Sequence, residues 1–144
     1  MCYVAMSSES VKADVPRDNA AETVLVAESD IFARMVLAQY LRECGYDVLE
    51  AGTSDDVLAL FRSGRRIDVI LLDAQISGGL AGFTLTRQIR ENFPDTEIVL
   101  TFGVVRAAEK AGDICDEGPL ERPYHPQEIV RRIQILRQSR AQKP

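Results

Sequence analysis

Residues 67–82, IDVILLDAQISGGLAG, decide the fold of this chain. The first half is a compact run of branched apolar side chains that ends abruptly at Asp73. A run this short that is followed by a turn is typical of a strand buried on both faces. A carboxylate at its end is costly to bury unless it lies at the mouth of a cleft. Because doubly wound sheets bind ligands at the carboxyl ends of their strands, we predict that Asp73 is the functional centre.

Short apolar runs alternate with helical patterns along the rest of the chain. We predict strands at residues 23–27, 46–51, 67–72 and 97–101, with a short fifth strand at 119–121. Between them, apolar side chains three and four residues apart predict helices, and a last helix begins at Pro126. This order indicates an α/β fold. Because crossovers are right-handed, we expect a doubly wound, flavodoxin-like sheet of five parallel strands in the order 2-1-3-4-5.

Length and charge limit the classes of protein to consider. The chain has 144 residues, which is enough for one domain with a proper core. Its net charge of −5 argues against a general nucleic-acid binder, and no apolar run is long enough to span a membrane. We expect a flexible tail at residues 1–21, one domain at 22–138, and a second tail at 139–144.

The cysteines and the first residues bear on the compartment. Cys2, Cys44 and Cys115 are an odd number without metal-binding spacing, so we expect them to be reduced and the protein to be cytoplasmic. The opening residues, MCYVAMSSES, lack the basic start and long apolar core of a secretory signal.

A second acid follows another predicted strand. In the expected strand order the first and third strands are neighbours about 4.8 Å apart, so Glu28 and Asp73 point into the same crevice. Two such carboxylates repel unless a cation or a proton neutralises one of them. Mg²⁺ suits the pair, because it binds one or two carboxylates and keeps waters. The alternative is that both acids only cap helices or face water.

Residues 23 to about 137 resemble the receiver domain of two-component response regulators. The matching motifs, in order, are VLVAESD (24–30), VILLDAQISGGLAGF (69–83), IVLTFG (98–103) and LERPY (120–124). The resemblance implies that Asp73 accepts a phosphoryl group from a histidine kinase or histidine phosphotransfer protein in a phosphorelay. The protein would then be no enzyme beyond self-phosphorylation and autodephosphorylation at Asp73.

The resemblance also implies roles for other residues. Glu28, Asp73 and the backbone carbonyl of Gln75 would hold Mg²⁺. Thr101 would hydrogen-bond the phosphoryl group, and Arg122 stands where the family has a lysine. The peptide bond of Arg122–Pro123 is expected to be cis.

Four positions depart from the family pattern. Ser29 replaces the second acid after the first strand, so we expect weak Mg²⁺ binding. Arg122 is larger and more planar than lysine, which changes its contact with phosphate. Phe102 replaces a small residue beside the pocket, and Pro119 replaces the aromatic residue of the family's switch.

We therefore expect a stand-alone receiver without an output domain. A homodimer could form through the fourth helix, fifth strand and fifth helix, and neither nucleic acid nor membrane is expected as a partner. One alternative is a degenerate receiver that binds proteins without being phosphorylated. A less favoured alternative is a magnesium-dependent phosphatase that uses Asp73 as its nucleophile.

Overall fold

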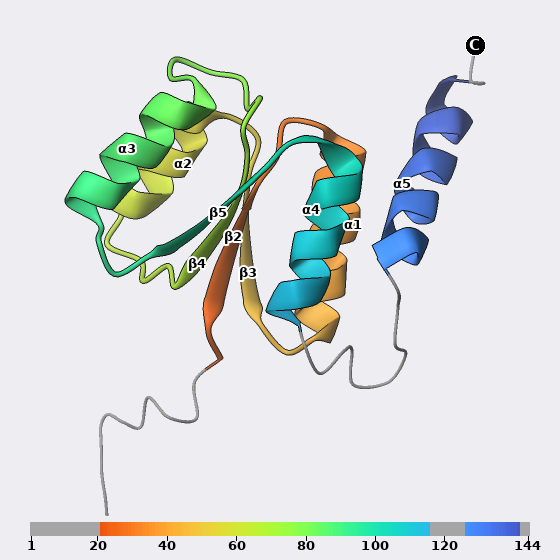
Figure 1. Cartoon of the computed structure of the whole chain (residues 1–144), viewed down its shortest axis with the longest axis horizontal. Helices are drawn as coiled ribbons and strands as arrows, with labels where there is room; N and C mark the ends of the chain where they lie inside the picture. The colour runs from red at the N-terminus through yellow and green to blue at the C-terminus, as the bar shows by residue number, and fades with distance from the viewer. Residues whose placement is uncertain (1–20, 116–125, 142–144) are drawn as a thin grey trace, which may run out of the picture.

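The computed structural model describes residues 21–115 and 126–141. Figure 1 shows its strands and helices, which alternate along most of the chain. In chain order they are β2 (Thr23–Ala27), α1 (Ile31–Glu43), β3 (Asp47–Ala51), α2 (Ser54–Arg62), β4 (Val69–Asp73), α3 (Gly82–Asn92), β5 (Glu97–Thr101), α4 (Gly103–Ile114) and α5 (Pro126–Ala141). The last helix thus includes residues 139–141, which the sequence had assigned to a tail.

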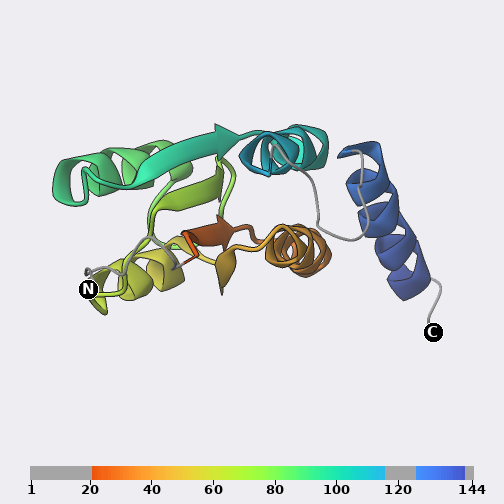
Figure 2. The ribbon, with the colours of Figure 1, turned by 90° about the horizontal axis from the view of Figure 1, so that it is seen from below.

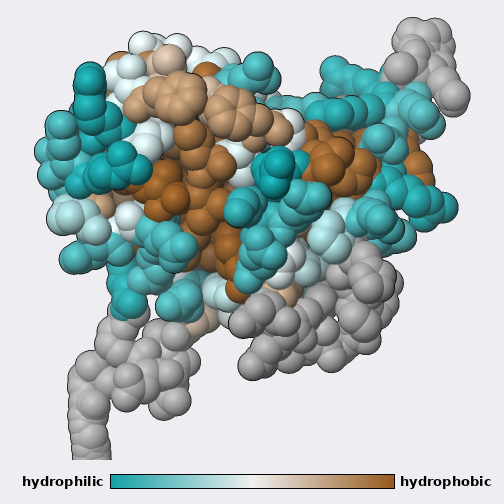
Figure 3. Space-filling view, in the orientation of Figure 1, coloured by the Kyte–Doolittle hydropathy of each residue, from teal (hydrophilic) through white to brown (hydrophobic). Residues whose placement is uncertain are grey.

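The described strands form one parallel sheet in the order β3-β2-β4-β5. This confirms the α/β class and the predicted order of the first four strands. The predicted fifth strand at 119–121 lies outside the described residues. Within the described part β5 is therefore an edge strand whose three middle side chains are only partly buried. Figure 3 shows apolar surface across the middle of the molecule in this view.

Each face of the sheet carries its own hydrophobic core. Successive side chains of a strand point to opposite faces, so Leu25 belongs to one core and Val24 to the other. The first core includes Phe61 of α2 and Leu85 of α3. The second lies under α1 and α4, and α5 adds Ile133 to it from outside. Figures 1 and 2 show α2 and α3 on one side of the sheet, and α1, α4 and α5 on the other.

The position of α4 beside α1 was not predicted from the sequence. Ala107, Ala108 and Ala111 are its buried side chains, and they pack in the core that α1 covers. Such small side chains allow a neighbouring helix to approach closely. No helix of the described part is long and apolar enough to cross a membrane.

A disulfide joins α1 to α4. Cys44 and Cys115 are the C-cap residues of the two helices, with Cα atoms 5.9 Å apart. The prediction that the cysteines are reduced is therefore wrong for this pair, while Cys2 lies outside the described residues. Beside the bond, the Tyr46 hydroxyl donates to the carbonyl oxygen of Ile114 at 2.6 Å. The sequence could not reveal this pair, because only the packing of α4 on α1 brings the cysteines together.

The disulfide should contribute substantially to stability. It closes a loop of 71 residues. A cross-link of this span lowers the entropy of the unfolded chain and so stabilises the folded state by about 2–4 kcal/mol. We expect Cys44→Ser to lower the free energy of unfolding by that amount in urea titrations without reductant. Cys2→Ser is the control and should change nothing. Equal unfolding midpoints for Cys44→Ser and the unaltered protein would contradict the prediction.

Candidate functional site

The carboxyl ends of three strands bring three predicted site residues together. Asp73 ends β4 and Thr101 ends β5, and the two are paired in the register of the sheet. Ala27 of β2 pairs with Leu72, which places Glu28, the next residue, beside Asp73. The sheet register thus confirms that Glu28 and Asp73 share one edge.

Glu28 is buried next to other acids. Its side chain is 8% exposed, and its carboxylate accepts a hydrogen bond from the backbone N–H of Asp30 at 2.9 Å. Burial raises the pKa of Glu28 to about 7, and the neighbouring carboxylates of Asp73 and Asp30 add to this against the opposing backbone bond. The charged form of this carboxyl group is therefore disfavoured when no cation is bound. A divalent cation at this edge would favour its charged form.

Asp73 and Thr101 are held by the backbone around them. An oxygen of Asp73 accepts from the N–H of Gln75 at 3.0 Å, and the Ala74 N–H donates to the carbonyl of Thr101 at 2.8 Å. Thr101 is 1% exposed, and its hydroxyl donates to the carbonyl oxygen of Leu72 at 3.4 Å. A bond of that length is weak. The hydroxyl can therefore exchange it for a better acceptor that arrives at Asp73.

Ser29 takes part in a different contact from the acid it replaces. Its hydroxyl oxygen accepts from the N–H of Ser77 at 2.8 Å and lies 3.0 Å from the Ser77 hydroxyl. Ser54 completes the attachment of this loop, because its N–H donates to the Ser77 carbonyl at 2.8 Å. Ser29 therefore anchors the loop after β4 to the loop after β2.

Two glycines permit the close approach of this loop. Gly78 has a φ of +122°, and a Cβ there would lie 2.4 Å from the hydroxyl oxygen of Ser54. A Cβ at Gly82 would lie 2.4 Å from the carbonyl oxygen of Ala74, the residue after Asp73. In the sequence these glycines are interpreted only as turn signals. In the structure they determine how closely the loop packs against the acidic edge.

A salt bridge attaches α5 to the same edge. Asp30 is the N-cap of α1, accepting from the N–H groups of Phe32 and Ala33 at 2.9 and 3.1 Å. Arg137 of α5 donates its Nε–H to Asp30 at 2.8 Å. Burial alone would raise the pKa of Asp30, but the helix N–H groups and Arg137 together hold it below its ordinary value. Sequence reasoning missed Arg137, which belongs to a run of basic residues that resembles a solvated helix face.

Two exposed aromatic rings stand beside the site. Phe102 follows Thr101 directly, and Phe83 follows Gly82 at the start of α3. The side chains are 59% and 63% exposed, and their ring centroids are 6.0 Å apart. Phe102 therefore packs against another exposed ring. The predicted roles of Arg122 and Pro119, and the cis bond of Arg122–Pro123, fall outside the described residues.

The residues at the edge fit Mg²⁺ with a small set of protein ligands. Glu28 and Asp73 supply two carboxylates, and burial of Glu28, together with the neighbouring charge of Asp73, raises the pKa of Glu28. Within residues 21–115 and 126–141 no cluster of three or more Asp, Glu, His or Cys side chains could hold a metal. Mg²⁺ accepts one or two carboxylates and fills its shell with water, so two acids are sufficient.

Residues 24–134 match the response regulator receiver domain family. The chain belongs to this family. Transcriptional regulatory protein AruR of Pseudomonas aeruginosa is 32% identical over 118 residues, which are 78% of this chain and 48% of AruR. The autoinducer 1 sensor kinase/phosphatase LuxN of Vibrio campbellii is 28% identical over 120 residues, 81% of this chain and 14% of LuxN. The chain thus spans less than half of either relative.

Solved receivers share the fold. Response regulator TrrA of Thermotoga maritima, in complex with Mg²⁺-BeF, is 28% identical with a TM-score of 0.51, covering 55% of this chain and 67% of TrrA. Chemotaxis response regulator CheY4 of Vibrio cholerae is 24% identical with a TM-score of 0.55, covering 80% of this chain and 98% of CheY4. Receiver domains bind Mg²⁺ and interact with histidine kinases, in agreement with the acidic edge.

The raised pKa of Glu28 should make metal-free stability depend on pH. The folded pKa of about 7 exceeds the ordinary 4.5, so the folded protein binds more protons between these values. The contribution is complete below pH 4.5 and is lost as the pH rises through 7. We expect the unaltered protein to lose about 2–3 kcal/mol relative to Glu28→Gln between pH 5 and 8.

Urea unfolding with a chelator present measures this difference. The control is Glu91→Gln, which changes an exposed carboxylate on α3. Parallel stability curves for Glu28→Gln and the unaltered protein would show that Glu28 titrates normally.

Proposed function

We propose that this receiver accepts a phosphoryl group on Asp73 from a histidine kinase or histidine phosphotransfer protein in a phosphorelay. The observation that carries the proposal is the position of Asp73, which lies beside Glu28 and is paired with Thr101 at the carboxyl edge of a parallel sheet. No role as an enzyme is proposed beyond self-phosphorylation and autodephosphorylation at Asp73.

The geometry suits the transfer of a phosphoryl group from a histidine to Asp73. An Asp73 oxygen attacks the phosphorus of a phosphohistidine, a P–O bond forms, the P–N bond breaks and the imidazole leaves. Bound Mg²⁺ would neutralise charge on the transferred group, and Glu28 and Asp73 would hold it. The N–H of Gln75 fixes the orientation of Asp73 at 3.0 Å. Thr101 can turn its weakly bonded hydroxyl from Leu72 to a phosphoryl oxygen.

The partners and location follow from this role. LuxN, one of the relatives, is named a sensor kinase/phosphatase, which supports a kinase as phosphodonor. We also propose a cytoplasmic location. A homodimer through the fourth helix, fifth strand and fifth helix stays a prediction.

One observation favours a second candidate function. The Ser29 hydroxyl is engaged with Ser77, so the edge has one acid fewer than is usual in the family. Weak Mg²⁺ binding would slow phosphorylation. The chain would then act as a degenerate receiver that binds its partner whether or not Asp73 is modified.

Phosphorylation should occur at Asp73 alone. After incubation with acetyl phosphate and Mg²⁺, intact-mass spectrometry should show the addition of one phosphoryl group that is stable in acid and labile in base. Asp73→Asn should abolish the adduct, because its amide is a poor nucleophile. Asp95→Asn, at an exposed loop position, is the control. An adduct that survives in Asp73→Asn would refute the assignment, and no adduct on the unaltered protein would favour the degenerate receiver.

Restoring the missing acid should strengthen Mg²⁺ binding. An aspartate at position 29 can still accept from Ser77 and places a further negative charge beside the cation. We expect Ser29→Asp to bind Mg²⁺ about tenfold more tightly in titration calorimetry. Ser29→Ala is the matched control, since it removes the hydroxyl without adding charge. Equal affinities for Ser29→Asp and the unaltered protein would count against Ser29 as the limiting position.

A further inference from the structure

The disulfide lies at one end of a helix whose other end adjoins the acidic edge. Cys115 is the C-cap of α4, and the helix begins at Gly103, two residues after Thr101. We propose that Cys44 and Cys115 form a redox modification site, where reduction by a dithiol loosens α4 and increases the reactivity of the Asp73 edge. The functional half of this proposal rests on the proposed phosphorylation of Asp73.

The two cysteines differ in access. Cys44 is half-buried, whereas Cys115 is 6% exposed. A dithiol thiolate therefore attacks the Sγ of Cys44, the S–S bond breaks, and Cys115 leaves and takes up a proton. The second thiol of the reductant then displaces Cys44. The reductant ends as a disulfide, and two electrons and two protons have passed to the protein.

Besides the disulfide, α4 is attached through small side chains and through the partly buried Val104 and Ile114. Its buried side chains are Ala107, Ala108 and Ala111, and burying an alanine removes little apolar surface from water. At its amino end, the N-cap Phe102 makes no capping hydrogen bond through its side chain. The disulfide and the bond from Tyr46 to Ile114 add two specific attachments between the carboxyl end of α4 and the end of α1.

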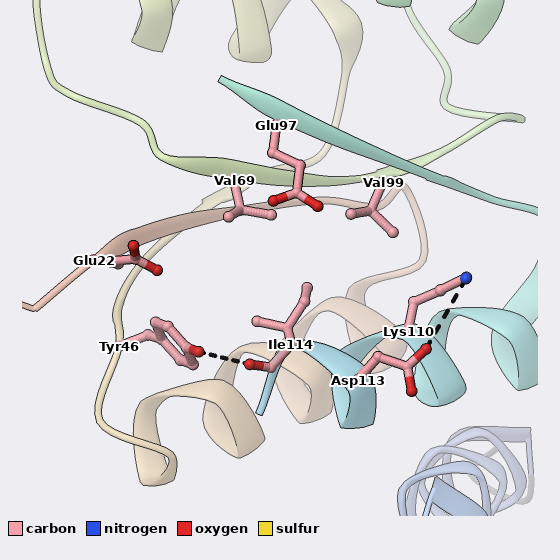
Figure 4. Close-up of a pocket in the computed structure, with 8 residues that line it drawn as sticks. All are labelled: Glu22, Tyr46, Val69, Glu97, Val99, Lys110, Asp113 and Ile114. Carbon is pink, nitrogen blue, oxygen red and sulfur yellow. Dashed lines mark hydrogen bonds and ion pairs between the residues drawn. The ribbon is translucent and has the colours of Figure 1, made fainter. Parts of the chain in front are cut away.

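A cavity beside the disulfide gives α4 room to move. It has a volume of about 330 Å³ and lies between the last turns of α4 and the sheet. Figure 4 shows Tyr46 and Ile114, the neighbours of the two cysteines, bonded at its wall. Across it lie Val69 and Val99, and Lys110 pairs with Asp113 on the α4 side. Once the cross-link opens, we expect the last turn of α4 to shift toward this space.

A movement of α4 would reach the acidic edge through a short connection. Only Phe102 separates Thr101 from α4, and Gly103 follows with a φ of +83°. The backbone of Thr101 is paired with Asp73, but its hydroxyl donates a long hydrogen bond of 3.4 Å, which is the contact that a shift of α4 would weaken first. In the proposed cytoplasmic location thiols are kept mostly reduced, and a disulfide there is usually a transient, redox-sensing one.

The experiment compares oxidised protein with protein treated with dithiothreitol, both carrying Cys2→Ser to leave one cysteine pair. Amide hydrogen exchange is followed over residues 97–115, and phosphorylation by acetyl phosphate is followed by intact mass. We expect reduction to accelerate exchange in α4 at least tenfold and to raise the initial rate of phosphorylation at least threefold. The double variant Cys44→Ser/Cys115→Ser should behave like the reduced protein and be insensitive to dithiothreitol.

Three results would overturn the proposal. The first is air-oxidised protein whose intact mass shows two free thiols. The second is an unchanged exchange rate in α4 after reduction. The third is altered exchange with an unchanged phosphorylation rate, which makes the disulfide a structural cross-link only. If neither redox state is phosphorylated at all, the proposed function of Asp73 fails, and exchange in α4 still decides whether the cysteine pair controls the helix.

Discussion

The register between β2 and β4 places two carboxyl groups side by side, and most of the surrounding structure is arranged around them. Ala27 pairs with Leu72, so Glu28 and Asp73 leave the sheet side by side. Burial and the neighbouring acids raise the pKa of Glu28 to about 7, which is the energetic signature of this crowding. A fold selected only for stability would place an apolar or amide side chain there. The pair of acids is instead suited to a cation, whose binding offsets the unfavourable electrostatics.

Contacts between distant segments enclose this edge. Ser29 binds Ser77, 48 residues away, and Asp30 binds Arg137, 107 residues away. The first contact fixes the loop after β4, and the second fixes α5 against the start of α1. Ser29 and Asp30 are the two residues that follow Glu28 in the sequence. A change at the acidic edge therefore acts at once on a loop and on a helix that are far apart in the sequence.

The parts of the fold set by local pattern were predictable from sequence. The apolar runs of β2, β4 and β5 predicted their strands. Glu28 and Asp73 follow from strand ends and strand order, whereas Thr101 follows from the resemblance to receiver domains. Features that arise only from packing were missed. In the sequence Arg137 resembles any solvated basic residue. The Cys44–Cys115 bond depends on α4 lying beside α1. Three alanines of α4 permit this packing, but their presence in the sequence does not predict it.

The same distinction separates the chemistry of the edge from its control. Carboxylates at strand ends are positioned by the sheet, whose backbone hydrogen bonds leave them little freedom. The Thr101 hydroxyl is attached differently, by a 3.4 Å hydrogen bond to the Leu72 carbonyl, and the fully buried side chains of α4 are alanines. A response to phosphorylation requires two arrangements of similar free energy, and light attachment supplies them. Because the disulfide constrains that freedom from the far end of α4, the number of accessible arrangements at Thr101 depends on a bond that lies outside the site itself.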